Sequence, residues 1–190
     1  MKTIRINSIP SLGVLLLSVL LFTACAQNKK KPLAEAAINA PEMDLQSAVV
    51  SDNLTAVRQH IEAGTDLNQK DAFSSSTPLI TAATFGRNEI AKALINAGAD
   101  LSLKNNDGST ALHSAAFFCR VEIVQQLIDA KADKTVLNNF GATPAQTVMG
   151  PFKEIKPIYE MMQQQLAPMG FQLDINEVEK TRPVIAMMLQ

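Results

Sequence analysis

Two stretches of this chain repeat one another at a period of about 33 residues, which is typical of a solenoid. Thr77–Asp100 reads TPLITAATFGRNEIAKALINAGAD, and Thr110–Asp133 reads TALHSAAFFCRVEIVQQLIDAKAD. A third start, Thr143-Pro144-Ala145, follows Thr110 at the same interval that separates Thr110 from Thr77. One unit of this size cannot bury its apolar face alone and stacks on its neighbours. The sequence therefore predicts a repeat protein.

Each unit contains the signals for two short helices and an extended arm. Thr77 is a hydroxyl N-cap, and Pro78 stands at the first helical position, where its missing N–H has no consequence. Gly86 ends this first helix with a positive φ angle, and Gly98 ends a second helix. Apolar residues at helical spacing define the second helix: Ile90, Ala91, Leu94 and Ile95. Residues 99–107 are rich in turn formers and predict an arm with a hairpin-like tip.

These signals resemble the ankyrin repeat, which shares the Thr-Pro-Leu start, the paired alanines and the Ala-Gly-Ala-Asp end at this period. The resemblance covers roughly residues 42–165. It implies an all-α solenoid of stacked helix-turn-helix units with short hairpin-like arms. We expect an ankyrin-repeat domain at 42–166 with about four units, at 42–71, 72–105, 106–138 and 139–166. The interval from Ala63 to Ala97 is one position longer than the repeat period, which predicts one extra residue in the first arm, within 73–76.

The end of the chain departs from the repeat pattern. The fourth unit keeps Gly-Ala-Thr-Pro at 141–144 and loses the pattern by Gly150-Pro151. Apolar residues at helical spacing in 154–166 predict a helix that completes this unit and caps the stack. Residues 167–190 are a C-terminal extension with a further helical segment. Three places for it remain open: over the last repeat, back on the groove, or in self-association.

The N-terminus has the pattern of a bacterial-type export signal. Lys2 and Arg5 precede the apolar run 12–22, and small residues follow at 23–26. The run is shorter than the ~20 apolar residues of a comfortable spanning helix. We therefore expect a signal peptide at 1–24 and a lysine-containing tether at 25–41.

Residues 21–25 also resemble a lipobox, the motif after which a bacterial signal peptidase leaves a lipidated cysteine. Phe22 departs from this motif, which usually has an aliphatic residue there. The resemblance implies a lipoprotein with lipid on Cys25 and its domain in the periplasm. Ala26 favours the outer membrane, since Asp at that place is associated with inner-membrane retention. The alternative is ordinary cleavage at 24–26, which leaves a soluble periplasmic protein.

Charge and motifs argue against several classes of function. The formal net charge is −1, so nothing indicates a nucleic-acid partner. No zinc-protease, paired-cysteine, phosphate-loop or nucleophile-elbow motif is present. His60 is expected in the core or at its boundary, and the resemblance gives His113 hydrogen bonds within and between repeats. We therefore predict a protein that is not an enzyme and takes no metal or cofactor.

Cys119 stands where the previous unit has Gly86, so a positive φ angle is expected there. A residue other than glycine in that conformation costs about 1 kcal/mol. With Cys25 lipidated or removed, Cys119 is the one thiol left in the folded domain. Inert packing is favoured over cross-linking to a partner.

Five of the chain's eight phenylalanines fall where ankyrin proteins usually contact their partners. Those places are the arm tips and the ends of the first helices, which together form the concave face. The resemblance implies the following protein-binding residues: Phe73, Phe85, Asn106, Asp107, Phe117, Phe118 and Phe140. Exposed aromatic side chains are typical anchors of an interface. The alternative is that Phe85 and Phe118 pack between repeats or under the C-terminal extension.

These observations predict a non-catalytic protein-binding module of the bacterial periplasm. It grips a protein partner of unknown identity through the concave face and arm tips, and it meets a membrane only through the anchor at Cys25. Resemblance to some periplasmic ankyrin proteins implies a role supporting an enzyme such as catalase. An immunity or inhibitor protein that neutralises a toxin in the periplasm is the alternative, although the mixed, polar tips do not favour a basic toxin. A purely structural lipoprotein is a further one.

Overall fold

The computed structural model describes residues 41–190. The expected signal peptide, the tether up to residue 40 and the lipidation site Cys25 lie outside the described residues. Within 41–190 the secondary structure consists of helices and turns, without strands. The elements are α1 (Leu45–Val50), α2 (Leu54–Glu62), α3 (Pro78–Phe85), α4 (Asn88–Asn96), α5 (Ala111–Phe117), α6 (Val121–Asp129), η1 (Ala145–Val148), α7 (Phe152–Leu166), η2 (Ala167–Met169) and α8 (Ile175–Met188). No helix of this part has the length and apolarity needed to cross a membrane.

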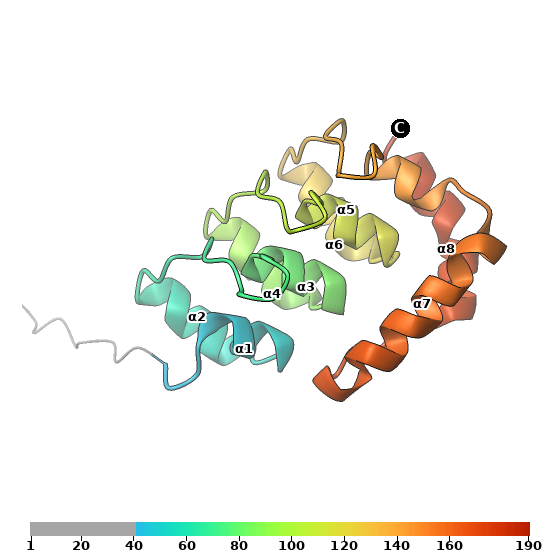
Figure 1. Cartoon of the computed structure of the whole chain (residues 1–190). Coiled ribbons are helices and arrows are strands. Elements are labelled where there is room, and N and C mark those ends of the chain that lie inside the picture. Colours follow the sequence, from blue (N-terminus) through green and yellow to red (C-terminus); the bar gives the residue numbers. More distant parts are fainter. Residues whose placement is uncertain (1–40) are drawn as a thin grey trace, which may run out of the picture. The chain divides into compact units, whose positions relative to one another are not determined.

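Six of these helices form three pairs that stack side by side (Figure 1). α1, α3 and α5 make an inner row, and α2, α4 and α6 make an outer row behind it. The apolar faces of both rows share one core, in which Leu79, Leu94, Leu112 and Leu127 are fully buried. The helix-turn-helix solenoid expected from the sequence is therefore confirmed.

Helix starts and ends follow the sequence signals. The Thr77 hydroxyl accepts a hydrogen bond from the Ile80 N–H at 3.3 Å, just ahead of Pro78. Gly86 ends α3 with φ 71°, and Cys119, its equivalent in the next unit, has φ 54°. The positive φ angle expected at Cys119 is confirmed. The turn between the two helices of a unit thus keeps one backbone conformation whichever residue occupies it.

His113 joins neighbouring units, as the resemblance implied. The Thr110 N–H donates to His113 Nδ1 at 3.2 Å, and His113 Nε2 lies 3.1 Å from the Ala142 carbonyl of the next arm. Burial lowers the pKa of His113, so the ring is neutral near pH 7. A neutral ring that accepts at Nδ1 carries its proton on Nε2 and donates it to Ala142. The side chain therefore has a structural role within and between repeats.

The arm tips, at 72–75, 106–109 and 139–142, are linked by a ladder of backbone hydrogen bonds. The Asn106 N–H donates to the Ser74 carbonyl at 2.8 Å, and the Asn139 N–H donates to the Asp107 carbonyl at 2.9 Å. The bond that closes the first tip joins residues 71 and 76, whereas the later ones join 105 with 109 and 138 with 142. The first arm thus has the extra residue that the sequence predicted.

The fourth unit differs from the expectation. Its first helix is only the single turn η1, and the partner that packs on η1 and α6 is α8 rather than α7. Ile185 of α8 and Leu189, which directly follows α8, lie in the core of the stack, whereas Tyr159 is the one buried residue of α7. The prediction that residues 154–166 complete the fourth unit was wrong, because α8 rather than α7 packs on η1 and α6 and buries Ile185 in the shared core. The extension covers the last repeat.

We expect Ile185→Ala to lower the free energy of unfolding of the whole stack by about 2–4 kcal/mol, because it leaves a cavity in the shared core. The matched control is Met187→Ala on the exposed side of the same helix, which should change it by less than about 0.5 kcal/mol. Urea unfolding followed by circular dichroism measures both. Equal, small effects would mean that α8 is not part of the core.

Candidate functional site

A long open groove lies between α7 and the inner side of the stack. Its volume is about 1210 Å³. One side is formed by α1, α3, α5 and the arm tips, and the other by α7 and η2. Figure 1 shows α7 running back along the stack from the fourth unit toward α1. Both ends of the stack therefore contribute to one continuous surface, which we call the groove.

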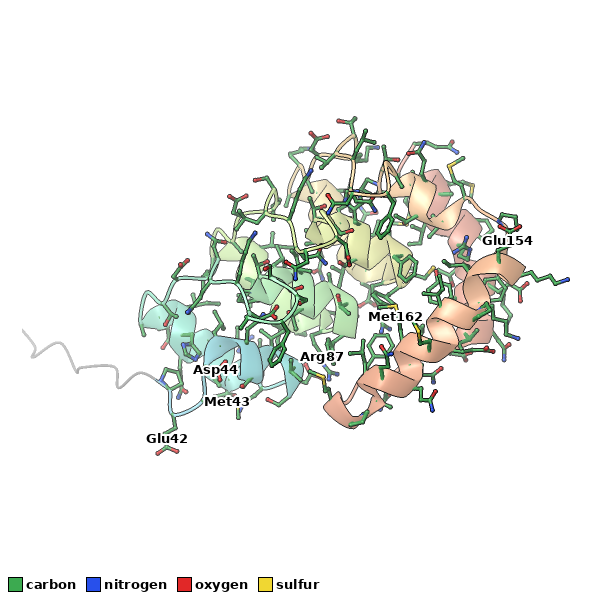
Figure 2. All side chains as sticks on the ribbon, viewed as in Figure 1. Glu42, Met43, Asp44, Arg87, Glu154 and Met162 are labelled. Carbon is green, nitrogen blue, oxygen red and sulfur yellow. The ribbon has the colours of Figure 1, made fainter. Side chains whose placement is uncertain are left out.

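The wall formed by α7 and η2 is an apolar stripe. Its residues recur at intervals of three or four positions: Ile155, Ile158, Met162, Leu166 and Met169. This spacing places them on one side of the helix. Figure 2 shows Met162 on the side of α7 that faces the stack. Met161, by contrast, is 48% exposed and does not line the groove.

Two of the expected anchors are buried rather than exposed. Phe85 is 7% exposed and Phe118 is 4% exposed. Both pack edge-to-face on Phe171, with ring centroids 5.7 Å and 5.3 Å away, in a second apolar cluster that includes Tyr159 of α7. The prediction that Phe85 and Phe118 anchor a partner is corrected, since the C-terminal segment covers them. They form part of the groove's floor.

The other predicted residues lie in or around the groove. Phe117 is half-buried and lines it between Phe118 and Tyr159. Phe73 is 94% exposed at the first tip, and Phe140 is 78% exposed at the third. Asp107 is exposed on the tip between them. All four line the groove, and their role in binding remains a prediction.

Asn106 is the one predicted residue outside the groove lining. Its side-chain Nδ2 donates to the Phe73 carbonyl at 3.0 Å, and its own carbonyl accepts from Asn139 Nδ2 at 2.9 Å. These bonds tie the three tips together. The structure therefore gives Asn106 a part in ordering the tips.

α7 is attached near its middle by a buried polar network that the sequence did not indicate. The Tyr159 hydroxyl donates to the Phe117 carbonyl of α5 at 2.7 Å and accepts from Arg182 Nη1 at 3.0 Å. Arg182 Nη2 donates to the Gly150 carbonyl at 2.8 Å. Arg182 is buried, and none of the ion pairs among the described residues includes it. The network joins α5, α7 and α8.

The segment after α7 is held by two arginines that recur at the repeat spacing. Arg87 Nη2 donates to the carbonyls of Val50 at 2.8 Å and Gly170 at 3.2 Å. Arg120 Nη2 donates to those of Thr84 at 3.2 Å and Gln172 at 2.8 Å. Figure 2 labels Arg87 between the stack and the end of α7. The equivalent positions of the two arginines were visible in the sequence, but their partners were not.

Burial changes the acid–base properties of the groups around these contacts. It lowers the pKa of the Arg120 guanidinium to about 10, and the charge of Arg87 adds to this, so Arg120 stays charged at neutral pH. It also raises the pKa of the Cys119 thiol to about 11. A thiol that is protonated at neutral pH is a poor nucleophile, which favours the inert packing expected for Cys119.

The charged groups that line the groove are two aspartates. Partial burial acts to raise the pKa of Asp71, but hydrogen bonds from the Ser74 N–H and hydroxyl outweigh it and lower the pKa below its usual value. Asp107 carries the second carboxylate. No lysine or arginine of the described chain lines the groove. Within residues 41–190, no three His, Cys, Asp or Glu side chains gather as a metal-ion site.

Comparison with known proteins agrees with this architecture. The family model described as "Ankyrin repeats (3 copies)" matches residues 45–138. The crystal structure of the ankyrin repeat domain of Bcl-3 has a TM-score of 0.52 and 29% identity, covering 54% of this chain and 45% of that one. The three complete helix pairs, within residues 45–138, are thus ankyrin repeats, and together they form an ankyrin-repeat protein-binding module.

Two curated relatives match over a shorter stretch. Protein phosphatase 1 regulatory subunit 27 of Homo sapiens and that of Mus musculus are each 41% identical over 64 residues. The match covers 34% of this chain and 41% of each relative. The chain thus spans less than half the length of the curated relatives that it matches.

Tyr159 offers a direct test of the buried network, because it is the chain's single tyrosine. Burial raises its pKa to about 12, although the Arg182 charge opposes the shift. The folded-state pKa lies above the unfolded value of about 10. The stability that the buried, protonated Tyr159 hydroxyl contributes is therefore present below pH 10 and is lost as the pH rises toward 12.

We expect the ultraviolet absorbance of tyrosinate to appear only near pH 12 in the folded protein. In concentrated urea the midpoint should return to about 10. A folded-state midpoint near 10 would mean that the tyrosine hydroxyl reaches solvent and that α7 does not rest on α5 as described.

Proposed function

We propose that this protein is a non-catalytic adaptor that holds a segment of a protein partner in the groove between α7 and the concave face. The observation that carries the proposal is the open, mainly apolar groove of about 1210 Å³ with exposed Phe73 and Phe140 at its rim. An exposed apolar surface of this kind usually marks an interaction site. Phe117 and the α7 stripe take the anchoring role that the sequence had also assigned to Phe85 and Phe118.

The partner that fits this proposal best is an enzyme that the module regulates or supports. The curated relatives are named as regulatory subunits of a phosphatase, which supports a role beside an enzyme rather than as one. The histidine of the groove lining, His113, is bonded to the Thr110 N–H and to the Ala142 carbonyl, which supports a structural role for it rather than a catalytic one. An accessory role for a periplasmic enzyme such as catalase remains a specific form of this proposal.

A groove-dependent pull-down tests the proposal. Residues 26–190, which contain the whole described part of the chain, serve as bait in extract from the native source. Ile158→Lys places a charge in the groove, whereas Met161→Lys places it at a position of α7 that does not line the groove, at similar exposure, 41% against 48%. We expect one partner to be retained by the parent and by Met161→Lys and lost by Ile158→Lys, with recombinant partner reproducing the pattern.

Circular dichroism of both variants checks that they remain folded. If the two variants recovered every captured protein equally, the groove would be ruled out as the binding site. Turnover of hydrolase substrates by the purified protein would contradict the non-catalytic part of the proposal.

We also propose that the protein is exported and anchored by lipid on Cys25, on the outer membrane rather than the inner one. The support is the sequence pattern at 1–26, with its basic start, short apolar run and lipobox-like residues. Membrane contact would then come from the lipid, and the groove would face the periplasm.

Metabolic labelling with a radioactive fatty acid tests the anchor in a bacterial host. We expect label on the parent chain and none on Cys25→Ala, with the parent in the outer-membrane fraction. An unlabelled parent in the soluble periplasmic fraction would favour ordinary cleavage, and an unprocessed cytoplasmic chain would contradict export altogether.

A further inference from the structure

The two walls of the groove have nearly the same length. Phe73 and Phe140 lie on arm tips two units apart, which corresponds to roughly 16–20 Å at the usual helix spacing of about 8–10 Å. On the other wall, the stripe from Ile155 to Met169 spans fourteen steps, or about 21 Å of helix. A straight occupant of the groove is therefore about 20 Å long where both walls contact it.

The groove has room for an α-helix. Its volume is about 1210 Å³, and it is open along one side. An α-helix with its side chains is about 10–12 Å across, and stacked sheets with their side chains lie about 10 Å apart, so a helix and an extended strand need similar room. The size of the groove therefore accommodates a helix, and the choice of a helix rests on the pattern of the walls.

The α7 wall has the pattern of a helix face that packs on another helix. Its apolar residues recur at three- and four-residue intervals over four turns, and α7 packs more closely on α8 and η2 than on α1 or α3. Ridges at this spacing accept the side chains of a second helix. Opposite them, Phe117 and Val50 offer further apolar contacts from the inner helices.

The two carboxylates of the groove lining favour an occupant with a positively charged side chain on its polar side. Asp71 and Asp107 are carboxylates on the arm-tip side, and no cation of residues 41–190 accompanies them on the lining. The Asp71 carboxylate accepts hydrogen bonds from four donors of its own arm, three backbone N–H groups and the Ser74 hydroxyl, which leaves Asp107 as the freer acceptor. Asp107 stands on the middle tip, with an exposed phenylalanine on each side. The order phenylalanine, aspartate, phenylalanine along the tips suits a partner segment with a basic side chain between two apolar ones.

We propose that the groove binds an amphipathic α-helix of about four turns, with its apolar side against α7 and Phe117 and a lysine or arginine beside Asp107. This inference rests on the proposed function and adds the conformation and charge of the partner segment. The spacing of the α7 wall and the charge of Asp107 favour this occupant, and the length and size of the groove accommodate it.

Designed peptides test this inference on residues 26–190. The probe is a peptide of about four helical turns, built of leucine and lysine at helical period with one tryptophan. Its fluorescence reports binding because the protein contains no tryptophan. One control peptide has the same composition in strict alternation, which is a strand pattern. A second keeps the helical period and replaces lysine by glutamate.

We expect the helical leucine–lysine peptide to bind at least about tenfold more tightly than either control, which corresponds to about 1.4 kcal/mol. Ile158→Lys should weaken it by about tenfold or more, and Met161→Lys should leave it unchanged. Asp107→Asn should weaken it severalfold at low salt, whereas Asp129→Asn on the exposed side of α6 should not.

Several results would overturn the inference. Equal binding of the alternating peptide would replace the helix by an extended segment, and equal binding of the glutamate peptide would remove the role of Asp107. A small apolar molecule that co-purifies with the protein and blocks all peptides would make the groove a small-ligand site. A groove-dependent partner in the pull-down, without binding of the helical peptide, would leave the proposed function standing and remove only this inference.

Discussion

The last unit of a repeat stack exposes an apolar side that some other part of the chain has to cover, and this requirement shapes the groove. α8 meets this requirement, since its Ile185 and the following Leu189 lie in the core that the repeats share. Because α8 takes the position of a second helix, α7 is left as a connection between the fourth unit and α8. It runs back along the inner side of the stack, and the space beside it is the groove. The binding surface thus follows from the way the solenoid ends.

Polar contacts at separate points hold α7 in that position. Arg182 is a buried cation that bonds a hydroxyl and a carbonyl instead of a carboxylate. Burying a charge is costly unless its donors are bonded, so this arrangement strongly favours one placement of α7 against α8. Arg87 and Arg120 act in the same way on the segment that follows α7. A wall held at several points needs little ordering when a partner binds, which reduces the entropic cost of association.

Features encoded by neighbouring residues could be predicted from the sequence. The cap at Thr77, the positive φ angle at Cys119, the His113 contacts and the extra residue of the first arm all depend on local or periodic patterns, and all are present. The phenylalanines behave differently. Sequence position places Phe85, Phe117 and Phe118 alike at helix ends, but exposure depends on what lies over them. Phe171 and Tyr159 cover two of them almost completely.

The sequence by itself determined the solenoid, its period, the turns inside each unit and the positions of the arm tips, because these follow from short-range signals that recur in every unit. It also located Phe73, Asp107 and Phe140 on the tips. Only the tertiary structure decided which of two apolar-striped C-terminal helices closes the stack and which forms the groove wall. That choice depends on how well each helix fits side chains far away in the chain, such as the contact of Tyr159 with Phe117, and no local pattern contains this information.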